Sequence, residues 1–347
     1  MNIPVHSLSY KKRSVYQTYP DWGVTKVQKK HKTVEYGKYG YIFLVPFFLV
    51  FLVFQFYPLL YTFYISFIQK QIKGHGRTAV VNAVFGFGNY ADYVFGDKGG
   101  GEVFQSIIIT VALWLLNFVP QILLSLLLAG WFTDAFNKLR GEGAYKVIMY
   151  MPNIITAATI AVLFYTFFET QGPVTSLLKH IGIVKEETSF LTSGYASMFI
   201  IAFIQFWMWY GNTMIVLIAG IMGISPSLYE AAMVDGATPT QQFWLITLPL
   251  LKPILQFTLV TSAIGGLQMY DIPQLFNQGG PIVMWGDKAV YSTKTIVMVI
   301  KTYIDAGPAQ DEGRAAAYSV ILFIVTLAIS MIFYFATSEK KSKVSGV

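Results

Sequence analysis

The chain contains 347 residues, of which 54% are hydrophobic and 12% charged, with a formal net charge of +7; soluble domains carry about 25% charged residues. The apolar residues fall in long blocks, so the composition is that of a membrane protein. Cysteine is absent, which excludes disulfides and cysteine-ligated metal sites. The histidines lie outside the apolar blocks without the spacing of metal ligands, so we expect solvated loop residues and no metal site. They are His6, His31, His75 and His180.

The chain begins with a basic tail over residues 1–40, which contains eight lysine or arginine residues and two acids, Asp21 and Glu35. One interpretation is attraction to anionic membrane lipid, worth about 1 kcal/mol for each basic residue near the surface. The other is a disordered tail whose only role is to orient the first membrane span. We favour the second interpretation.

Six apolar runs follow, each close to the roughly 20 residues with which a helix crosses the bilayer core. We therefore expect an all-α integral membrane protein with six transmembrane helices, in a domain over residues 41–336 that ends in a tail over 337–347. The first run is too long for a signal-peptide core and lacks a small-residue cleavage site, so we interpret it as a retained anchor. The runs are residues 41–67, 103–132, 147–168, 196–222, 254–270 and 315–335.

The distribution of basic residues predicts the orientation of these spans. Six spans place both termini on one side of the membrane, and that side holds 15 of the 25 lysine and arginine residues. The opposite loops hold the other 10, offset by 11 of the 18 acids. Because basic residues accumulate in cytoplasmic loops, we expect both termini, and the loop between the fourth and fifth runs, to be cytoplasmic.

None of the six runs contains Asp, Glu, Lys, Arg or His. A proton-coupled carrier keeps titratable groups inside the membrane, so this pattern argues against proton coupling. It argues less strongly against sodium coupling, because backbone carbonyls can coordinate a sodium ion. A membrane-embedded enzyme would need clustered acids, a metal or a nucleophile–base set in the spans, so we expect no enzyme activity. The net charge follows the loops rather than a recognition face, so we expect no nucleic-acid binding. No phosphate loop for ATP is present either.

The loop over residues 223–253 predicts two short helices joined by a turn. The first helix begins at Pro226, preceded by Ser225; alternatively, Ser227 and Glu230 form a capping box. We expect helix over residues 230–234 in either case.

Gly236 then permits a backbone turn that residues with a Cβ resist, and Thr238 caps a second helix, with Gln241 reaching back to it. The helix–glycine–helix pattern alone fits an ordinary connector between spans. The order and spacing of eleven residues in the loop are more specific: Glu230, Ala231, Ala232, Asp235, Gly236, Ala237, Phe243, Ile246, Leu248, Pro249 and Pro253.

This string resembles the cytoplasmic EAA loop of ATP-binding-cassette importer permeases, the loop that docks on an ATPase subunit. Small alanines let a partner approach closely, and the carboxylate of Glu230 offers a charged contact. The coupling residues implied by the resemblance are Glu230, Ala231, Ala232, Asp235, Gly236 and Ala237.

Shorter stretches extend the resemblance to sugar-importer permeases of the maltose and glycerol-phosphate type over roughly residues 41–335. Residues 87–90, 279–281 and 314–318 are similar to motifs of that family, although Arg314 replaces a smaller residue. The resemblance implies a type I importer permease with a second homologous permease, two ATPases that hold ATP and Mg, and an extracytoplasmic solute-binding protein. It implies a bacterial plasma-membrane location, contact with lipid, and no cofactor in this chain.

A neutral sugar needs hydrogen-bonding side chains and aromatic faces in a mostly apolar cavity. We expect the substrate pathway at two polar stretches, comprising Gln205, Trp209, Tyr210, Asn212, Gln268, Tyr270 and Asp271. Alternatively, Tyr210 belongs to an interfacial aromatic belt, Gln205 and Asn212 bond a neighbouring helix, and Asp271 is simply solvated.

We therefore expect one permease subunit of an importer for a carbohydrate, an oligosaccharide in particular. The resemblance leaves open a non-sugar solute such as glycerol phosphate or a polyol. A stand-alone secondary carrier is the alternative from another class. The absence of basic residues from the spans favours a neutral saccharide over an anionic solute.

Overall fold

The computed structural model describes residues 37–73, 80–134, 140–285, 288–306 and 310–337. The predictions for most of the basic tail and for nearly all of the C-terminal tail lie outside the described residues. So do His6, His31 and His75.

The chain divides into two compact units, residues 1–55 and 56–347. In the first unit α1 (Gly37–Phe51) and the π-helical turn η1 (Leu52–Phe56) form an apolar helix whose aromatic side chains pack on one another. The rings of Phe47 and Phe51, one turn apart, stack with their centroids 6.2 Å apart. Helix continues through residues 39–66, the first apolar span.

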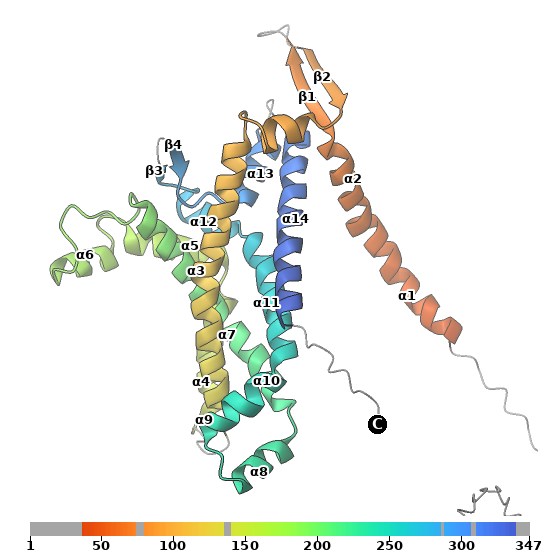
Figure 1. Cartoon of the computed structure of the whole chain (residues 1–347). Coiled ribbons are helices and arrows are strands. Elements are labelled where there is room, and N and C mark those ends of the chain that lie inside the picture. Colours follow the sequence, from red (N-terminus) through yellow and green to blue (C-terminus); the bar gives the residue numbers. More distant parts are fainter. Residues whose placement is uncertain (1–36, 74–79, 135–139, 286–287, 307–309, 338–347) are drawn as a thin grey trace, which may run out of the picture. The chain divides into compact units, whose positions relative to one another are not determined.

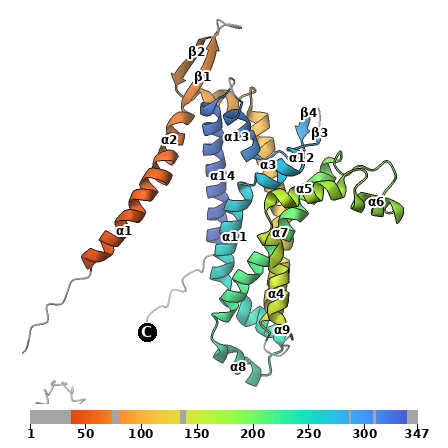
Figure 2. The same ribbon diagram turned by 180° about the vertical axis from the view of Figure 1, so that it is seen from behind.

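Three unbroken helices make the frame of the second unit (Figures 1 and 2). They are α3 (Gly100–Phe132), α7 (Gly194–Met222) and α14 (Glu312–Thr337). Together with residues 39–66, these are the four helices in the described chain that are long and apolar enough to cross a membrane. The short helix α2 (Tyr57–Ser66) packs on α14.

The other two expected spans are helix pairs bent at a break. The first pair comprises α4 (Glu142–Tyr150), η4 (Met151–Ile154), α5 (Ala157–Phe168) and α6 (Pro173–His180), bent by 88°. The second comprises α9 (Pro239–Gln242), η5 (Phe243–Thr247), α10 (Leu248–Leu250), α11 (Lys252–Leu267) and α12 (Asp271–Asn277), bent by 64°. Counting each pair as one span gives six, as predicted.

A proline lies near each break, and proline lacks the backbone N–H of a helix interior. Pro152 lies in the 3-10 turn η4, after which the backbone at Ile155 becomes extended. Pro253 lies in the first turn of α11, directly after the second break. The first break therefore interrupts the apolar run over residues 147–168, whereas the second precedes the run over residues 254–270.

Two hairpins, which the sequence analysis did not predict, lie at the end of the bundle that we call the hairpin end (Figure 1). The first pairs β1 (Ile68–Lys73) with β2 (Val80–Phe85), and the second pairs β3 (Ile282–Trp285) with β4 (Lys288–Tyr291), both antiparallel. The turn η3 (Asn89–Val94) and helix α13 (Ile296–Ile304) complete this end.

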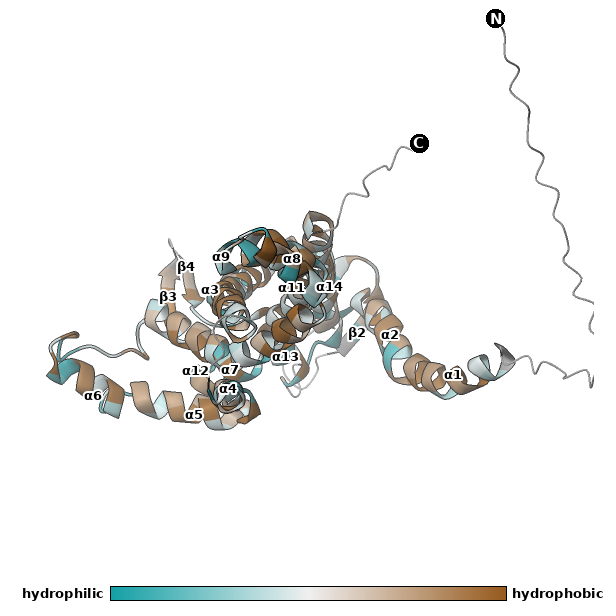
Figure 3. Ribbon diagram, turned by 90° about the horizontal axis from the view of Figure 1, so that it is seen from below, coloured by the Kyte–Doolittle hydropathy of each residue, from teal (hydrophilic) through white to brown (hydrophobic). Residues whose placement is uncertain are grey.

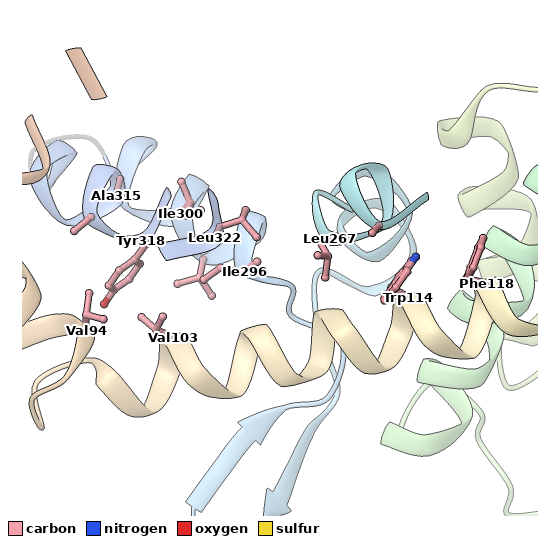
Figure 4. Close-up of a cluster of buried hydrophobic side chains, with 13 residues drawn as sticks. Val94, Val103, Trp114, Phe118, Leu267, Ile296, Ile300, Ala315, Tyr318 and Leu322 are labelled. Carbon is pink, nitrogen blue, oxygen red and sulfur yellow. The ribbon is translucent and has the colours of Figure 1, made fainter. Parts of the chain in front are cut away.

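The opposite end, which we call the loop end, is formed by α8 (Pro226–Val234) and α9. Hydrophilic residues gather on these two helices, whereas the long helices are mainly hydrophobic (Figure 3). The largest apolar cluster joins α3 to α11, α13 and α14 (Figure 4). Trp114 and Phe118 of α3 stack in it with their ring centroids 5.7 Å apart. The long helices are thus fixed around a shared core between the two ends.

Candidate functional site

A cavity of about 440 Å³, lined by both polar and apolar side chains, lies among α3, α7 and α11. Six of the seven residues predicted for the substrate pathway line it: Gln205, Trp209, Asn212, Gln268, Tyr270 and Asp271. The structure therefore brings together two stretches that are more than 50 residues apart in the sequence. We call this space the main cavity.

The seventh residue, Tyr210, does not line the main cavity. Residues 205, 209 and 212 follow the spacing i, i+4 and i+7, which places them on one helix face, while residue 210 lies about 100° further round. Its ring packs beside that of Phe206, with the centroids 5.8 Å apart. Trp207 is likewise outside the cavity and packs beside Phe164.

Helix α3 supplies a wall of the main cavity that the sequence analysis missed, through Trp114, Asn117 and Gln121. Their spacing of three and four residues puts them on one face of an otherwise apolar run. That pattern was a signal available in the sequence. The cavity also contains hydroxyl groups from α7 and α11, which belong to Thr213, Thr258, Thr261 and Ser262.

Hydrogen bonds hold α3 against both neighbouring helices at the level of the main cavity. Gln121 Nε2 donates to Thr213 Oγ1 of α7 at 2.7 Å, and Trp114 Nε1 donates to Ser262 Oγ of α11 at 3.1 Å. Gly266 allows the tryptophan to approach, because a Cβ there would lie 2.0 Å from Trp114 Cδ1. These polar groups are already hydrogen-bonded to one another, and their bonds hold the cavity walls together.

Other polar groups of the main cavity are uncommitted. The side-chain amides of Gln205, Asn212 and Gln268 have no hydrogen-bond partner within the described part of the chain. Trp209 exposes 45% of its surface, and a Cβ built on Gly265 would meet no atom within 4 Å. The cavity thus offers free amides beside an aromatic face, and the alternative that Gln205 and Asn212 bond a neighbouring helix receives no support from the contacts.

At the loop end, the predicted helix–turn–helix is present. Helix α8 begins at Pro226 after Ser225, so the first of the two predicted starts is observed and the capping box from Ser227 is not. Gly236 has φ +79°, the left-handed region that favours glycine. Thr238 caps α9 in a capping box with Gln241.

The residues predicted to contact an ATPase are on the surface of this loop. Glu230, Ala231, Asp235 and Gly236 are exposed, while Ala232 and Ala237 are half-buried. Neither carboxylate has a partner among the described residues. Two apolar side chains are also uncovered, since Val234 is 89% exposed and Leu245 is 73% exposed.

The coupling loop (residues 223–253) is held together by an internal hydrogen bond and contacts the bundle through Phe243. Tyr229 of α8 shares a hydrogen bond of 2.9 Å with Thr247, which joins the two halves of the loop. Phe243 packs on Gly130 of α3, where a Cβ would lie 2.8 Å from the ring. A displacement of the loop therefore acts directly on the helix that lines the main cavity.

At the hairpin end, Lys294, Tyr303 and Arg314 surround Glu102, and we call these four residues the Glu102 cluster. Its carboxylate accepts from Lys294 Nζ at 3.3 Å and from the hydroxyl of Tyr303 at 2.8 Å, and lies 3.6 Å from Arg314 Nη2. The guanidinium of Arg314 lies 4.0 Å from the ring centroid of Tyr303 and 4.4 Å from that of Tyr93. Burial, followed by the hydrogen bond to Glu102, raises the pKa of Tyr303 well above its ordinary value.

Comparison with known proteins identifies related chains along nearly the whole length. The lactose transport system permease protein LacF of Rhizobium radiobacter is 28% identical over 313 residues, covering 88% of this chain and 96% of the relative. The arabinooligosaccharides transport system permease protein AraP of Bacillus subtilis is 29% identical over 306 residues, covering 84% and 86%. The sn-glycerol-3-phosphate transport system permease protein UgpA of Agrobacterium fabrum is 28% identical over 303 residues, covering 87% and 94%.

The fold is that of a solved importer. A chain of a bacterial ABC transporter involved in the import of the acidic polysaccharide alginate matches with a TM-score of 0.64 and 23% identity, covering 88% of this chain and 96% of that one. The predicted type I importer permease fold is confirmed. The family described as binding-protein-dependent transport system inner membrane component matches residues 121–343, and this chain belongs to that family.

Proposed function

We propose that this chain is one of two permease subunits of an importer for a neutral oligosaccharide, and that the solute passes through the main cavity. The supporting observation is the chemistry of that cavity: three amides without partners lie beside the exposed face of Trp209. Such groups suit hydroxyl groups and the apolar face of a sugar ring. The named relatives for lactose and arabinooligosaccharides agree with this solute class.

The charge of the main cavity favours a neutral solute. No lysine or arginine is among the residues that line it in the described chain, and Asp271 is the charged residue there. An anionic solute would bring a negative charge into a site without a compensating cation, which is unfavourable. The relatives for glycerol phosphate and alginate therefore share the fold but are the weaker guide to the solute.

The surface of the coupling loop supports the other subunits that we propose for the importer. Its exposed carboxylates and its uncovered Val234 and Leu245 suit contact with another protein. We place this loop and both termini in the cytoplasm of a bacterial cell, where one of two ATPases docks on it and the ATPases hold ATP and Mg. A second permease completes the pathway, and an extracytoplasmic binding protein delivers the solute. Movement of the ATPases shifts the permeases between inward-open and outward-open states.

The first test is purification of this chain, tagged at its C terminus, in mild detergent, followed by mass spectrometry of the proteins that accompany it. We expect a phosphate-loop ATPase and a second permease. Recovery of the chain alone, from membranes in which it transports solute, would instead indicate a stand-alone carrier.

The second test uses the purified complex and its binding protein to screen saccharides for stimulation of ATP hydrolysis. Gln205→Ala, Trp209→Ala and Asn212→Ala should each raise the saccharide concentration for half-maximal stimulation about tenfold, the change expected from losing a contact of about 1.4 kcal/mol. Trp207→Ala is the matched control, because this tryptophan on the same helix does not line the cavity. Equal stimulation in all four variants would indicate that the solute contacts lie in the partner permease.

A further inference from the structure

A second cavity, of about 460 Å³, lies at the hairpin end. One wall is the first two turns of α3, where the spacing i, i+3, i+4 and i+7 puts four side chains on one face. These are Glu102, Gln105, Ser106 and Ile109. The facing wall is β4 with the start of α13, through Ala289, Val290, Tyr291, Lys294 and Val299. Its size matches that of the main cavity, with which it shares no lining residue.

The side chains of this second cavity include committed and uncommitted polar groups. Lys294 Nζ lies 3.3 Å from Glu102 Oε1 and 5.0 Å from the ring centroid of Tyr291. The amide of Gln105 and the hydroxyl of Tyr291 have no hydrogen-bond partner within the described residues. The cavity thus combines a free amide, a free hydroxyl and a tyrosine ring that is 44% exposed.

The paired charges suit neutral hydroxyl groups. An ammonium donates hydrogen bonds and a carboxylate accepts them, so neighbouring hydroxyls of one sugar ring satisfy both. The tyrosine ring offers a surface for the C–H face of the sugar.

A hydrogen-bonded layer separates the two cavities. Thr295 Oγ1 donates to the carbonyl of Met269 at 2.8 Å, and the backbone N–H of Ile296 donates to Thr110 Oγ1 at 3.0 Å. Met269 lines the main cavity, and the neighbour of Thr295, Lys294, lines the second. The cavities therefore lie at successive levels of α3, separated by about 18 Å between residues 105 and 117 at 1.5 Å per residue.

We propose that the second cavity is a separate binding site for a sugar unit of a neutral saccharide, held by Gln105, Tyr291 and the Glu102–Lys294 pair. This inference rests on the proposed function, because the solute is taken from it. In the orientation proposed above, the site faces the side from which the solute arrives. It gives the subunit two saccharide sites, one at each level of α3.

The test exploits the absence of native cysteine. Ala289→Cys introduces a small reporter that lines the second cavity and leaves the proposed contacts intact. The rate of its reaction with a thiol reagent is measured on the complete complex in nanodiscs, with lactose, trehalose and arabinotriose as probes. At about ten times the half-saturating concentration, occupancy predicts a labelling rate about tenfold slower. Asp97→Cys, exposed at the same end but outside the cavity, should react at an unchanged rate.

Two glutamine variants, each combined with the Ala289→Cys reporter, then separate the sites. Gln105→Ala should weaken binding about tenfold and so reduce the protection from about tenfold to about twofold, whereas Gln268→Ala, the same change in the main cavity, should leave it intact. Equal loss in both variants would overturn a separate site. Stimulation of ATP hydrolysis by a saccharide without protection of the reporter would overturn this inference alone. Neither stimulation nor protection by any of the three saccharides would overturn the proposed function as well.

Discussion

Three acidic residues at the two ends of the helix bundle have contrasting surroundings. At the hairpin end, Glu102 is surrounded by Lys294, Tyr303 and Arg314, all from this chain. At the loop end, Glu230 and Asp235 are exposed and have no partner among the described residues. Charges satisfied within one chain stabilise its own fold, whereas charges left open at a shaped surface are available to another protein. The comparison separates a structural end from a docking end.

The sharpest way to break this comparison is to disturb the backbone of the docking end. Gly236→Pro replaces a residue at φ +79° with one confined to about −65°, and removes an N–H that donates to Met233 at 3.1 Å. We expect loss of solute uptake while the chain remains in the membrane, measured by transport and by immunoblot of membrane fractions.

Gly182→Pro is the matched control for this change. Gly182 has φ +74° and its N–H donates to Lys179 at 3.0 Å, so the local damage is equivalent, but the site lies outside the coupling loop. Uptake should persist in this variant. Equal loss of uptake in both variants would attribute the defect to misfolding rather than to coupling.

A second, smaller effect tests the structural end. Arg314→Ala removes the guanidinium between Tyr93 and Tyr303 and leaves Glu102 with one fewer cation. The Arg314 side chain is only 14% exposed, but Glu102 is 36% exposed, so we expect a loss of about 2 kcal/mol in unfolding free energy, below the range for fully buried pairs. Unfolding of the purified chain in detergent measures it.

Lys301→Ala is the comparison for that variant, since it breaks an exposed ion pair with Asp305. Exposed pairs contribute little because solvent screens them, so no measurable change is expected. If both variants unfold alike, the Glu102 cluster is not a structural centre.

The smallest effect concerns a single hydrogen bond and its dependence on pH. Tyr303→Phe removes the bond to Glu102, which should cost about 1 kcal/mol. The pKa of Tyr303 is raised in the folded chain above the ordinary value of 10.0. The folded state therefore holds this proton more tightly, so its stabilising contribution is complete below pH 10 and declines as the pH rises above it.

Above pH 10 the unfolding free energy of the Tyr303→Phe variant should fall less steeply with pH than that of the unmodified chain, because the variant lacks this titrating hydroxyl. Unfolding measured across that pH range checks the prediction. Tyr195→Phe is the control, because Tyr195 is 90% exposed and has no hydrogen-bond partner in the described chain. An unchanged alkaline slope in Tyr303→Phe would contradict the assignment.

The sequence was most informative where the structure is local. Pro226, Gly236 and Thr238 each act on the backbone beside them, and the coupling loop follows the prediction at all three. The predicted family and six apolar spans are confirmed for the same reason, because motifs and apolar runs are contiguous in the chain.

Features that depend on contacts between distant segments were harder to predict. The α3 wall of the main cavity depends on which face of that helix meets α7 and α11, which no local pattern determines. Tyr210 was predicted from its neighbourhood in sequence, but the cavity selects residues by helix face. The β1–β2 hairpin was missed because β1, with the sequence IQKQIK, contains only two strand-favouring residues, both isoleucine.

Gly265 has a consequence for how this permease could acquire a new solute. Some wall positions of the main cavity, such as Trp114 and Gln121, hold neighbouring helices together, so a substitution there disturbs the packing. Gly265 lines the cavity, yet an added Cβ would meet no protein atom within 4 Å. A larger residue at position 265 would narrow the space for the solute without repacking the protein. A single substitution at this position could therefore change the preferred solute from a larger sugar to a smaller one.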